Sequence, residues 1–331
     1  MSSGSSAPGA PAEMGGAGPA GSGGDGPPPA VWIIAGAVLA VLAAAGALSF
    51  HYAERPFVRY NLERLAALAA DRPPEAAVVV ALGASRLRHA TLDEAAMAEE
   101  GARRGMPDLR FLRIVHNSGQ FADFEPFLDA VLGLRPRLVL LELDLLFKER
   151  RTLPFYHHHL RALIDAALRG RPLRADPAEE QFAKPCARAG EPEWDGDAGR
   201  LDRFEQNVGR EMRFSADSPG YDRVRRFVLR AGAQGTRVAV LQLRSRPVWE
   251  ARAYGPGNAY RPDALERVAR DPAVTLWRYP DALQRATLYC DYVHLTGEGR
   301  VAYSAWLLDR IAAALRASAG AAWNAPAAER F

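Results

Sequence analysis

Three residues of this chain have the types and order that nucleophilic catalysis requires. Ser85 follows an apolar, β-branched run that ends in a glycine, Ala77–Gly83. A serine hydroxyl attacks poorly until a neighbouring base removes its proton. Near the other end of the chain, Asp291 and His294 flank two apolar residues. On a turn both side chains can point the same way, so that the carboxylate holds one imidazole nitrogen while the other faces a serine. The pattern predicts Ser85 as nucleophile, His294 as base and Asp291 as its orienting partner.

A second polar turn supplies candidate groups for an oxyanion hole. Asn117-Ser118-Gly119 follows a second apolar run, Leu109–Val115. If both runs are strands of one parallel sheet, the two turns lie at the same edge. We therefore expect the backbone N–H groups of Ser85 and Gly119, with Asn117 as a further candidate, to stabilise an oxyanion. Each motif alone is also explained by ordinary turn composition, and a lone Asp-x-x-His is equally typical of a structural aspartate and histidine.

Three arginines are candidates for binding an anionic part of a substrate. Arg86 and Arg88 follow the serine, with His89 as a further candidate beside them, and Arg244 follows the fourth expected strand. A solvated helix face explains the first two equally well. No metal or other cofactor is expected, because the consecutive histidines His157–His159 rarely converge on one ion.

The elements that must position these residues alternate between strands and helices. Apolar runs predict strands at Ala77–Gly83, Leu109–Val115, Leu138–Leu143, Thr236–Leu243 and Ala273–Trp277. The composition predicts helices over Arg86–Glu100, Thr91–Arg104, Phe124–Leu134, Leu160–Leu168, Tyr221–Ala231 and Pro262–Arg270, and a last helix from about Gly297. This alternation predicts an α/β fold, a three-layer α/β/α sandwich with a mostly parallel five-stranded sheet.

The regions outside this pattern differ sharply in composition. Residues 1–29 are rich in Gly, Pro, Ala and Ser and are expected to be disordered. Ala30–Phe50 carries no charge and is long enough to span a bilayer as a transmembrane helix, with a signal peptide as the weaker alternative. A juxtamembrane helix or linker is expected over 51–74, the α/β domain over 75–318 with an insertion at about 148–220, and a tail over 319–331.

Charge and cysteine content limit the possible partners and compartment. Charged residues make up 24% of the 331 residues and the net charge is +3, without a dense basic block interleaved with aromatics, so nucleic-acid binding is not expected. The two cysteines, Cys186 and Cys290, can pair in an oxidising compartment or remain free thiols. Arg55, Arg59 and Arg64 follow the apolar segment, which by the positive-inside rule alone places the C-terminal domain in the cytoplasm.

The motifs together resemble the SGNH (GDSL-like) hydrolase superfamily, over roughly residues 75–318. Leu82-Gly83-Ala84-Ser85 is similar to its serine block, Asn117-Ser118-Gly119 to its glycine block, and Asp291-Tyr292-Val293-His294 to the block before its last helix. The resemblance implies a flavodoxin-like sheet. The third block departs from the family: members usually carry Gly-x-Asn-Asp, whose asparagine donates to the oxyanion, whereas this strand ends in Glu142-Leu143-Asp144. Ionised carboxylates cannot replace that donor, and instead suit a basic group or a substrate hydroxyl.

Membrane-anchored members with a similar serine block resemble the proteins of alginate O-acetylation and the DltD protein of teichoic acid D-alanylation. That resemblance implies a serine esterase or O-acyltransferase outside the cytoplasm, against the arginine count. Its expected partners are the lipid bilayer through residues 30–50, an acylated glycan or small ester as substrate, and a membrane acyltransferase. The alternative, motivated by the third block, is an inactive binding or scaffold protein of an envelope polymer modification complex.

Overall fold

The computed structural model describes residues 27–170, 177–182, 193–215, 217–253 and 262–320. The chain divides into two units, Met1–Ala45 and Gly46–Phe331. The first contains the start of helix α1, Pro29–Asp71, whose segment Pro29–Leu48 is long and apolar enough to cross a membrane, with a mean hydropathy of 2.4. The expected disordered leader falls almost wholly outside the described residues.

The second unit is built on a five-stranded parallel sheet. Its strands are β1 Ala77–Gly83, β2 Leu109–Val115, β3 Leu138–Glu142, β6 Arg237–Leu241 and β7 Thr275–Trp277. They pair in the order β2-β1-β3-β6-β7, and every pairing is parallel. All five carboxyl ends therefore lie at one edge, where open α/β sheets place their ligands. The predicted fold class is confirmed.

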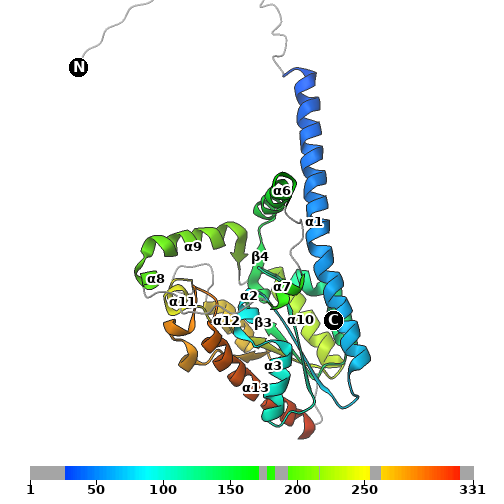
Figure 1. The fold of residues 1–331 in the computed structure, drawn as a ribbon, viewed down its shortest axis with the longest axis vertical. Coiled ribbons are helices and arrows are strands. Elements are labelled where there is room, and N and C mark those ends of the chain that lie inside the picture. Colours follow the sequence, from blue (N-terminus) through cyan, green and yellow to red (C-terminus); the bar gives the residue numbers. More distant parts are fainter. Residues whose placement is uncertain (1–26, 171–176, 183–192, 216, 254–261, 321–331) are drawn as a thin grey trace, which may run out of the picture. The chain divides into compact units, whose positions relative to one another are not determined.

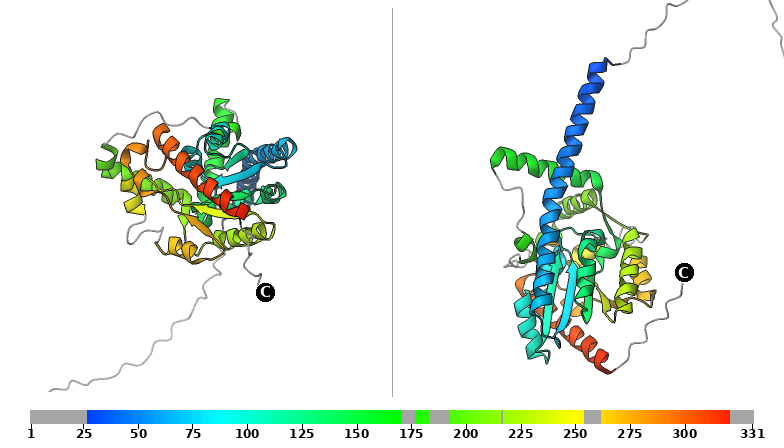
Figure 2. Two further views of the ribbon diagram at one scale, coloured as in Figure 1. Left: turned by 90° about the horizontal axis from the view of Figure 1, so that it is seen from below. Right: turned by 90° about the vertical axis from the view of Figure 1, so that its right-hand side faces the viewer.

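Helices cover both faces of the sheet (Figure 1). Alternate residues of β1 point to opposite sides, so that Val78 and Val80 join one buried cluster while Val79 and Ala81 join the other. The first cluster is completed by the C-terminal part of α1 and by η1 Phe121–Phe127, α4 Leu128–Gly133, α5 Asp144–Phe147, α10 Pro219–Ala233 and α12 Pro262–Arg270. The second is completed by α2 Ser85–Ala90, α3 Glu94–Arg103 and α13 Gly297–Gly320. In Figure 2, α13 is coloured orange to red.

The helix expected after Ser85 is interrupted at Thr91. The Thr91 hydroxyl donates to the Leu87 carbonyl oxygen at 2.9 Å and closes α2. Two residues later the Asp93 side chain accepts a hydrogen bond from the Ala96 N–H and begins α3. A capping aspartate inside a helical stretch marks a new N-terminus. By contrast, the apolar segment and the juxtamembrane helix, expected as separate elements, form the single helix α1.

The insertion between α5 and α10 is more ordered in its described parts than expected. Strand β4, Lys148–Arg150, pairs antiparallel with β5, Met212–Phe214. Between them lie α6 Thr152–Arg169, α7 Pro177–Phe182, α8 Glu193–Gly196 and α9 Ala198–Glu211. Only the Leu160–Leu168 part of α6 was predicted.

Helix α9 packs against the C-terminal part of the domain. Its Phe204 ring lies 4.8 Å from the Trp249 ring of α11, Pro247–Ala253, and 5.0 Å from the Tyr292 ring, both between centroids. Tyr292 lies between Asp291 and His294 in the sequence. The insertion thus packs directly against the loop that carries both residues.

Candidate active site

Ser85 lies where β1 turns into α2. Ala84 is extended, with φ −102° and ψ −167°, and Ser85 is the first helical residue and half-buried. Gly83 makes this turn possible, because a Cβ there would lie 2.7 Å from both Glu142 Oε2 and the Leu87 side chain. The small residue thus lets the serine turn approach β3 closely.

The structure brings Ser85, His294 and Asp291 together in one hydrogen-bonded chain. Nδ1 of His294 lies 2.7 Å from Oδ2 of Asp291, and Nε2 lies 2.9 Å from Oγ of Ser85. A carboxylate only accepts hydrogen bonds, so the proton of the neutral ring is on Nδ1, and Nε2 is free to accept from the serine hydroxyl. This is the arrangement in which a histidine can take the proton of a serine nucleophile.

The Asp-x-x-His turn fixes its own aspartate. Oδ1 of Asp291 accepts hydrogen bonds from the N–H groups of Val293 at 2.8 Å and His294 at 2.7 Å. Burial opposes ionisation of Asp291, but the hydrogen bond and charge of His294, together with the two N–H groups, outweigh it and hold the pKa of Asp291 below its ordinary value. The carboxylate is therefore ionised near neutral pH. Cys290, the residue before Asp291, is disulfide-bonded; Cys186, the other cysteine of the chain, lies outside the described residues.

The two N–H groups predicted for the oxyanion hole differ in whether they already donate a hydrogen bond within the protein. The Ser85 N–H begins α2, and no acceptor for it is found among the described residues. The Gly119 N–H donates instead to the His116 carbonyl oxygen at 2.9 Å, within a turn where Ser118 has φ 55°. Gly119 is thus engaged in its own turn, which differs from its predicted role. The Asn117 side chain is exposed.

The two acidic residues of the third block, Glu142 and Asp144, contact the serine turn and Arg86, which the sequence did not reveal. Glu142 is fully buried, and its carboxylate accepts hydrogen bonds from the Ala84 N–H at 2.6 Å and from Arg86 Nε at 3.2 Å. Arg86 also forms an ion pair with Asp144 and donates to the Leu243 carbonyl oxygen at 3.1 Å. Arg86 was expected to bind an anionic substrate. It instead neutralises two buried carboxylates beneath the serine turn.

The other two candidate arginines also make contacts within the protein. Arg244 forms ion pairs with Glu250 at 3.1 Å and with Asp281 at 3.0 Å. Arg88 is half-buried, and its Nη2 lies 3.5 Å from His89 Nε2. For Arg244 the protein's own carboxylates thus occupy the guanidinium that was expected to bind substrate.

His89, which the sequence offered only as a residue that could hold an anionic substrate group, lies beside the proposed base. It lies four positions after Ser85 on α2, hence on the same face of that helix. Its ring packs against the His294 ring, with 4.4 Å between centroids and 43° between planes. The spacing from Ser85 was visible in the sequence and is the signal that could have identified it.

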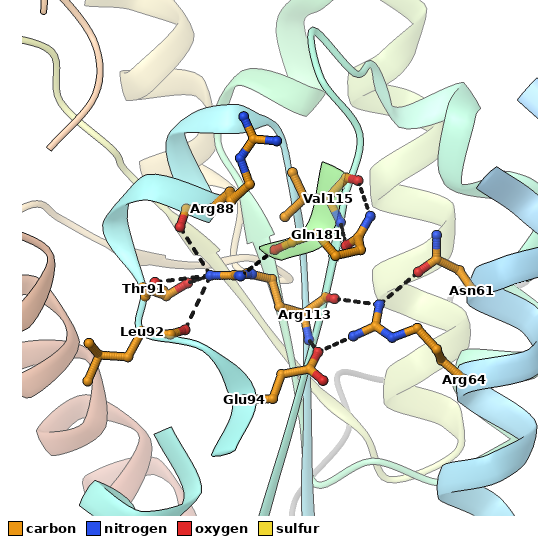
Figure 3. Close-up of polar contacts among 9 residues, drawn as sticks. All are labelled: Asn61, Arg64, Arg88, Thr91, Leu92, Glu94, Arg113, Val115 and Gln181. Atoms are coloured by element: carbon orange, nitrogen blue, oxygen red, sulfur yellow. Dashed lines mark hydrogen bonds and ion pairs between the residues drawn. The ribbon is translucent and has the colours of Figure 1, made fainter. Parts of the chain in front are cut away.

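The C-terminal end of α2 is held by a buried arginine of β2 (Figure 3). Nη1 of Arg113 donates to the carbonyl oxygens of Arg88, Thr91 and Leu92 and to the Thr91 hydroxyl, at 2.8 to 3.2 Å. Arg300 of α13 also donates to the Thr91 carbonyl oxygen. Burial lowers the pKa of Arg113 to about 9, so this guanidinium is still charged near neutral pH.

Side chains also cap the outer edge of β2 (Figure 3). The Gln181 amide of α7 pairs with the Val115 backbone like a strand residue, accepting from its N–H at 2.7 Å and donating to its oxygen at 2.6 Å. At Arg113, the backbone N–H donates to Glu94 at 2.8 Å and the carbonyl oxygen accepts from Arg64 of α1 at 3.0 Å. Edge-strand groups left open invite pairing with other chains, and these contacts prevent it.

No family model matches the sequence. No curated protein matches it either. Solved structures similar to the chain include the following two. One is described as a crystal structure of an acetyl xylan esterase, AlAXEase, at 13% identity, covering 72% of this chain and 99% of that one with a TM-score of 0.37. The other is a putative lipolytic protein of the G-D-S-L family from Desulfitobacterium hafniense DCB-2, at 12% identity, covering 70% of this chain and 98% of that one, also with a TM-score of 0.37. The function below is argued from the site itself.

Proposed function

We propose that this chain is a serine esterase or O-acyltransferase of the SGNH type. One observation carries the proposal: His294 lies within hydrogen-bonding distance of both Ser85 Oγ and Asp291 Oδ2, at 2.9 and 2.7 Å. This chain of groups lies at the carboxyl edge of a parallel sheet whose strand order is the one the resemblance implies. The same constellation of serine, histidine and aspartate performs acyl transfer on several unrelated folds.

The reaction follows from the positions of these atoms. Ser85 Oγ attacks the acyl carbonyl carbon while its proton passes to Nε2 of His294. The ester C–O bond then breaks, and the leaving alcohol takes that proton. Water or an acceptor hydroxyl next attacks the acyl-serine and gives its proton to Nε2; the bond from the acyl carbon to Ser85 Oγ then breaks, and Oγ takes the proton back from Nε2. Asp291 stays ionised and stabilises the imidazolium that forms in each step.

The oxyanion would be stabilised in part by the Ser85 N–H at the start of α2. The third block has no asparagine donor, because its strand ends in Glu142-Leu143-Asp144, and an ionised carboxylate cannot donate. Loss of one such donor costs on the order of 10²–10³ in rate. We therefore expect slow turnover of simple esters, and faster turnover when the natural substrate supplies binding energy.

The compartment and substrate class rest on two further observations. Pro29–Leu48 has the length and hydropathy of a membrane anchor, and a disulfide at Cys290 is typical of an oxidising compartment. Together with the resemblance, they support a membrane-anchored domain outside the cytoplasm that acts on acyl esters of a cell-envelope polysaccharide. A membrane acyltransferase that supplies acyl groups remains the expected partner.

Hydrolysis of p-nitrophenyl acetate by the purified full chain tests the proposal. We expect Ser85→Ala to lower kcat by at least about 10³-fold, since no other group can replace the hydroxyl. Ser215→Ala is the matched control, because this serine follows β5 in the insertion and its hydroxyl accepts a local hydrogen bond from the Asp217 N–H. Equal loss in both variants, or none in Ser85→Ala, would contradict the role of Ser85.

A scaffold function is the second candidate. It is favoured by the carboxylate of Glu142 in the third block and by the engaged N–H of Gly119, which together remove two of the donors expected for an oxyanion. On this account Ser85→Ala leaves polymer modification in cells unchanged, while replacement of the Ala30–Phe50 segment abolishes it. Loss of modification in Ser85→Ala cells, with the protein present at its normal level, would exclude the scaffold function.

A further inference from the structure

Beside the proposed triad lies a fourth side chain, His89, whose ring packs against the ring of His294. His294 uses Nδ1 toward Asp291 at 2.7 Å and Nε2 toward Ser85 at 2.9 Å, and a ring nitrogen directs its hydrogen bond along the ring. These hydrogen bonds fix the direction of each ring nitrogen, but leave the ring able to swing out of its plane. A ring packed closely against the imidazole opposes that motion, and the His89 ring lies 4.4 Å from the His294 ring between centroids, with 43° between the two planes.

The ring nitrogens of His89 form no strong hydrogen bond among the described residues. His89 is 9% exposed, and its buried Nδ1 has no hydrogen-bond partner among the described residues. Its Nε2 lies 3.5 Å from Arg88 Nη2, at the outer limit of a hydrogen bond. A buried polar atom without a partner is destabilising. We therefore look for the role of His89 in the packing of its ring and not in its hydrogen bonds.

His89 is also uncharged wherever the proposed reaction runs. Burial, the charge of His294 and the charge of Arg88 lower its pKa to about 3; Arg300 of α13 acts in the same direction, and only Asp291 opposes them. A neutral ring does not repel the imidazolium that forms on His294 during catalysis. An aromatic face beside a cation is moderately attractive.

The backbone just after His89 is held by side chains of two elements, β2 and α13. Arg113 and Arg300 both donate to the Thr91 carbonyl oxygen, two residues further on. The Leu92 N–H donates to Ser304 Oγ of α13 at 2.8 Å. Ser85 and His89 are one turn apart on α2, so the nucleophile and the ring move as one body. A rigid support of this kind is what positioning requires.

We propose that His89 is a positioning residue for the reaction, holding the ring of His294 in line between Ser85 and Asp291. This inference rests on the proposed function, because it assigns a role within the same triad. It concerns the ring and not its nitrogen atoms, so phenylalanine should replace His89 and an aliphatic side chain of similar volume should not.

The test compares three variants of the full chain with the wild type on p-nitrophenyl acetate. His89→Phe keeps a ring and removes an unpartnered polar atom; we expect kcat within about threefold of the wild type. His89→Leu and His89→Gln lack a ring, and we expect kcat to fall about tenfold or more while KM changes less than twofold, as misplacement of a catalytic group predicts. Circular dichroism and the unfolding temperature establish that each variant is folded.

The outcomes are separable from those of the proposed function. If His89→Leu and His89→Gln, both folded, turn over as fast as the wild type, the inference is wrong although the esterase stands. A rise in KM with kcat unchanged in these two variants would also overturn the inference. If His89→Phe fails to fold, the comparison of His89→Gln with the wild type decides, since Gln keeps polar atoms without a ring. If the wild type itself shows no Ser85-dependent turnover, the proposed function fails, and this inference with it.

Discussion

The carboxylate of Glu142 lies 2.6 Å from the backbone nitrogen of Ala84 and accepts its hydrogen bond, one residue before the proposed nucleophile. The contact joins the end of β3 to the turn after β1. Arg86, which follows the serine, donates to the other oxygen of the same carboxylate at 3.2 Å. One buried acidic residue thus holds the backbone before the serine and the side chain after it.

Substitutions of Glu142 should therefore act on the turn. Glu142→Ala leaves the Ala84 N–H and part of the Arg86 charge without a partner, and we expect a loss of about 3 kcal/mol in stability and of more than tenfold in kcat. Glu142→Gln keeps an oxygen acceptor of the same shape, so kcat should stay closer to the wild type. Denaturant unfolding and ester hydrolysis on both variants check this. A fully active Glu142→Ala variant would contradict the supporting role.

The ionised state of Asp291 should be essential. Asp291→Asn keeps an oxygen for the Val293 and His294 N–H groups but presents an amide that no longer requires a proton on Nδ1 of His294. We expect kcat to fall on the order of 10³–10⁴-fold while the fold is retained, because the histidine then holds the wrong tautomer. The measurement is steady-state ester hydrolysis near neutral pH. Activity within tenfold of the wild type would show that Asp291 does not orient the base.

His89 should make the folded chain sensitive to acid. Its pKa is about 3 in the folded state against about 6.5 when unfolded, so between these values only the unfolded chain takes up the proton. The contribution of the neutral His89 to the free energy of unfolding is complete above about pH 6.5. As the pH falls below that value, this stability is lost by up to about 1.4 kcal/mol per pH unit. His89→Phe removes this term. The unfolding temperature of the wild type should therefore drop further than that of His89→Phe between pH 7 and pH 4; parallel curves would contradict the prediction.

The Gln181 contact should stabilise the edge of the sheet. Gln181→Ala exposes the N–H and C=O groups of Val115 on β2, and we expect a loss of about 1–3 kcal/mol, seen as a drop of several degrees in the unfolding temperature. Gln206 of α9 is exposed, so Gln206→Ala is the matched control and should change little. Equal unfolding temperatures for the two variants would mean that the amide pairing contributes nothing to stability.

The proposed location can be tested by protease access. If residues 30–50 anchor the chain with its α/β domain outside the cytoplasm, a tag joined to the C-terminus should be degraded by a protease added to intact spheroplasts. A cytoplasmic marker protein should survive the same treatment. Protection of the tag until the membrane is lysed would favour the orientation given by Arg55, Arg59 and Arg64 under the positive-inside rule.

The sequence was sufficient for the sheet because its strands are buried on both faces. Runs such as Ala77–Gly83 and Leu138–Glu142 are apolar throughout, a pattern typical of a parallel sheet, and the alternation with helices gave the fold class. Ser85, Asp291 and His294 could be selected because the type and order of the residues already specify a chemistry.

The parts that were not predicted depend on contacts between distant segments. Nothing near Arg86 in the sequence shows that it pairs with Glu142, which lies 56 residues away. The Gly119 N–H is engaged by a local turn whose geometry the composition does not define. The contact of His89 with His294 was not predicted, because a histidine on a helix has no distinctive pattern until the fold brings the two rings together.

The central claim is that Ser85 is activated by His294, and covalent labelling tests it most directly. Purified full-length wild type, Ser85→Ala and His294→Ala would be treated with a fluorophosphonate, and the adduct located by peptide mass spectrometry. We predict one adduct on Ser85 in the wild type, none on that residue position in Ser85→Ala, and labelling slowed by at least about 10²-fold in His294→Ala. A folded wild type that stays unlabelled, or labelling that is equally fast without His294, would contradict the proposal.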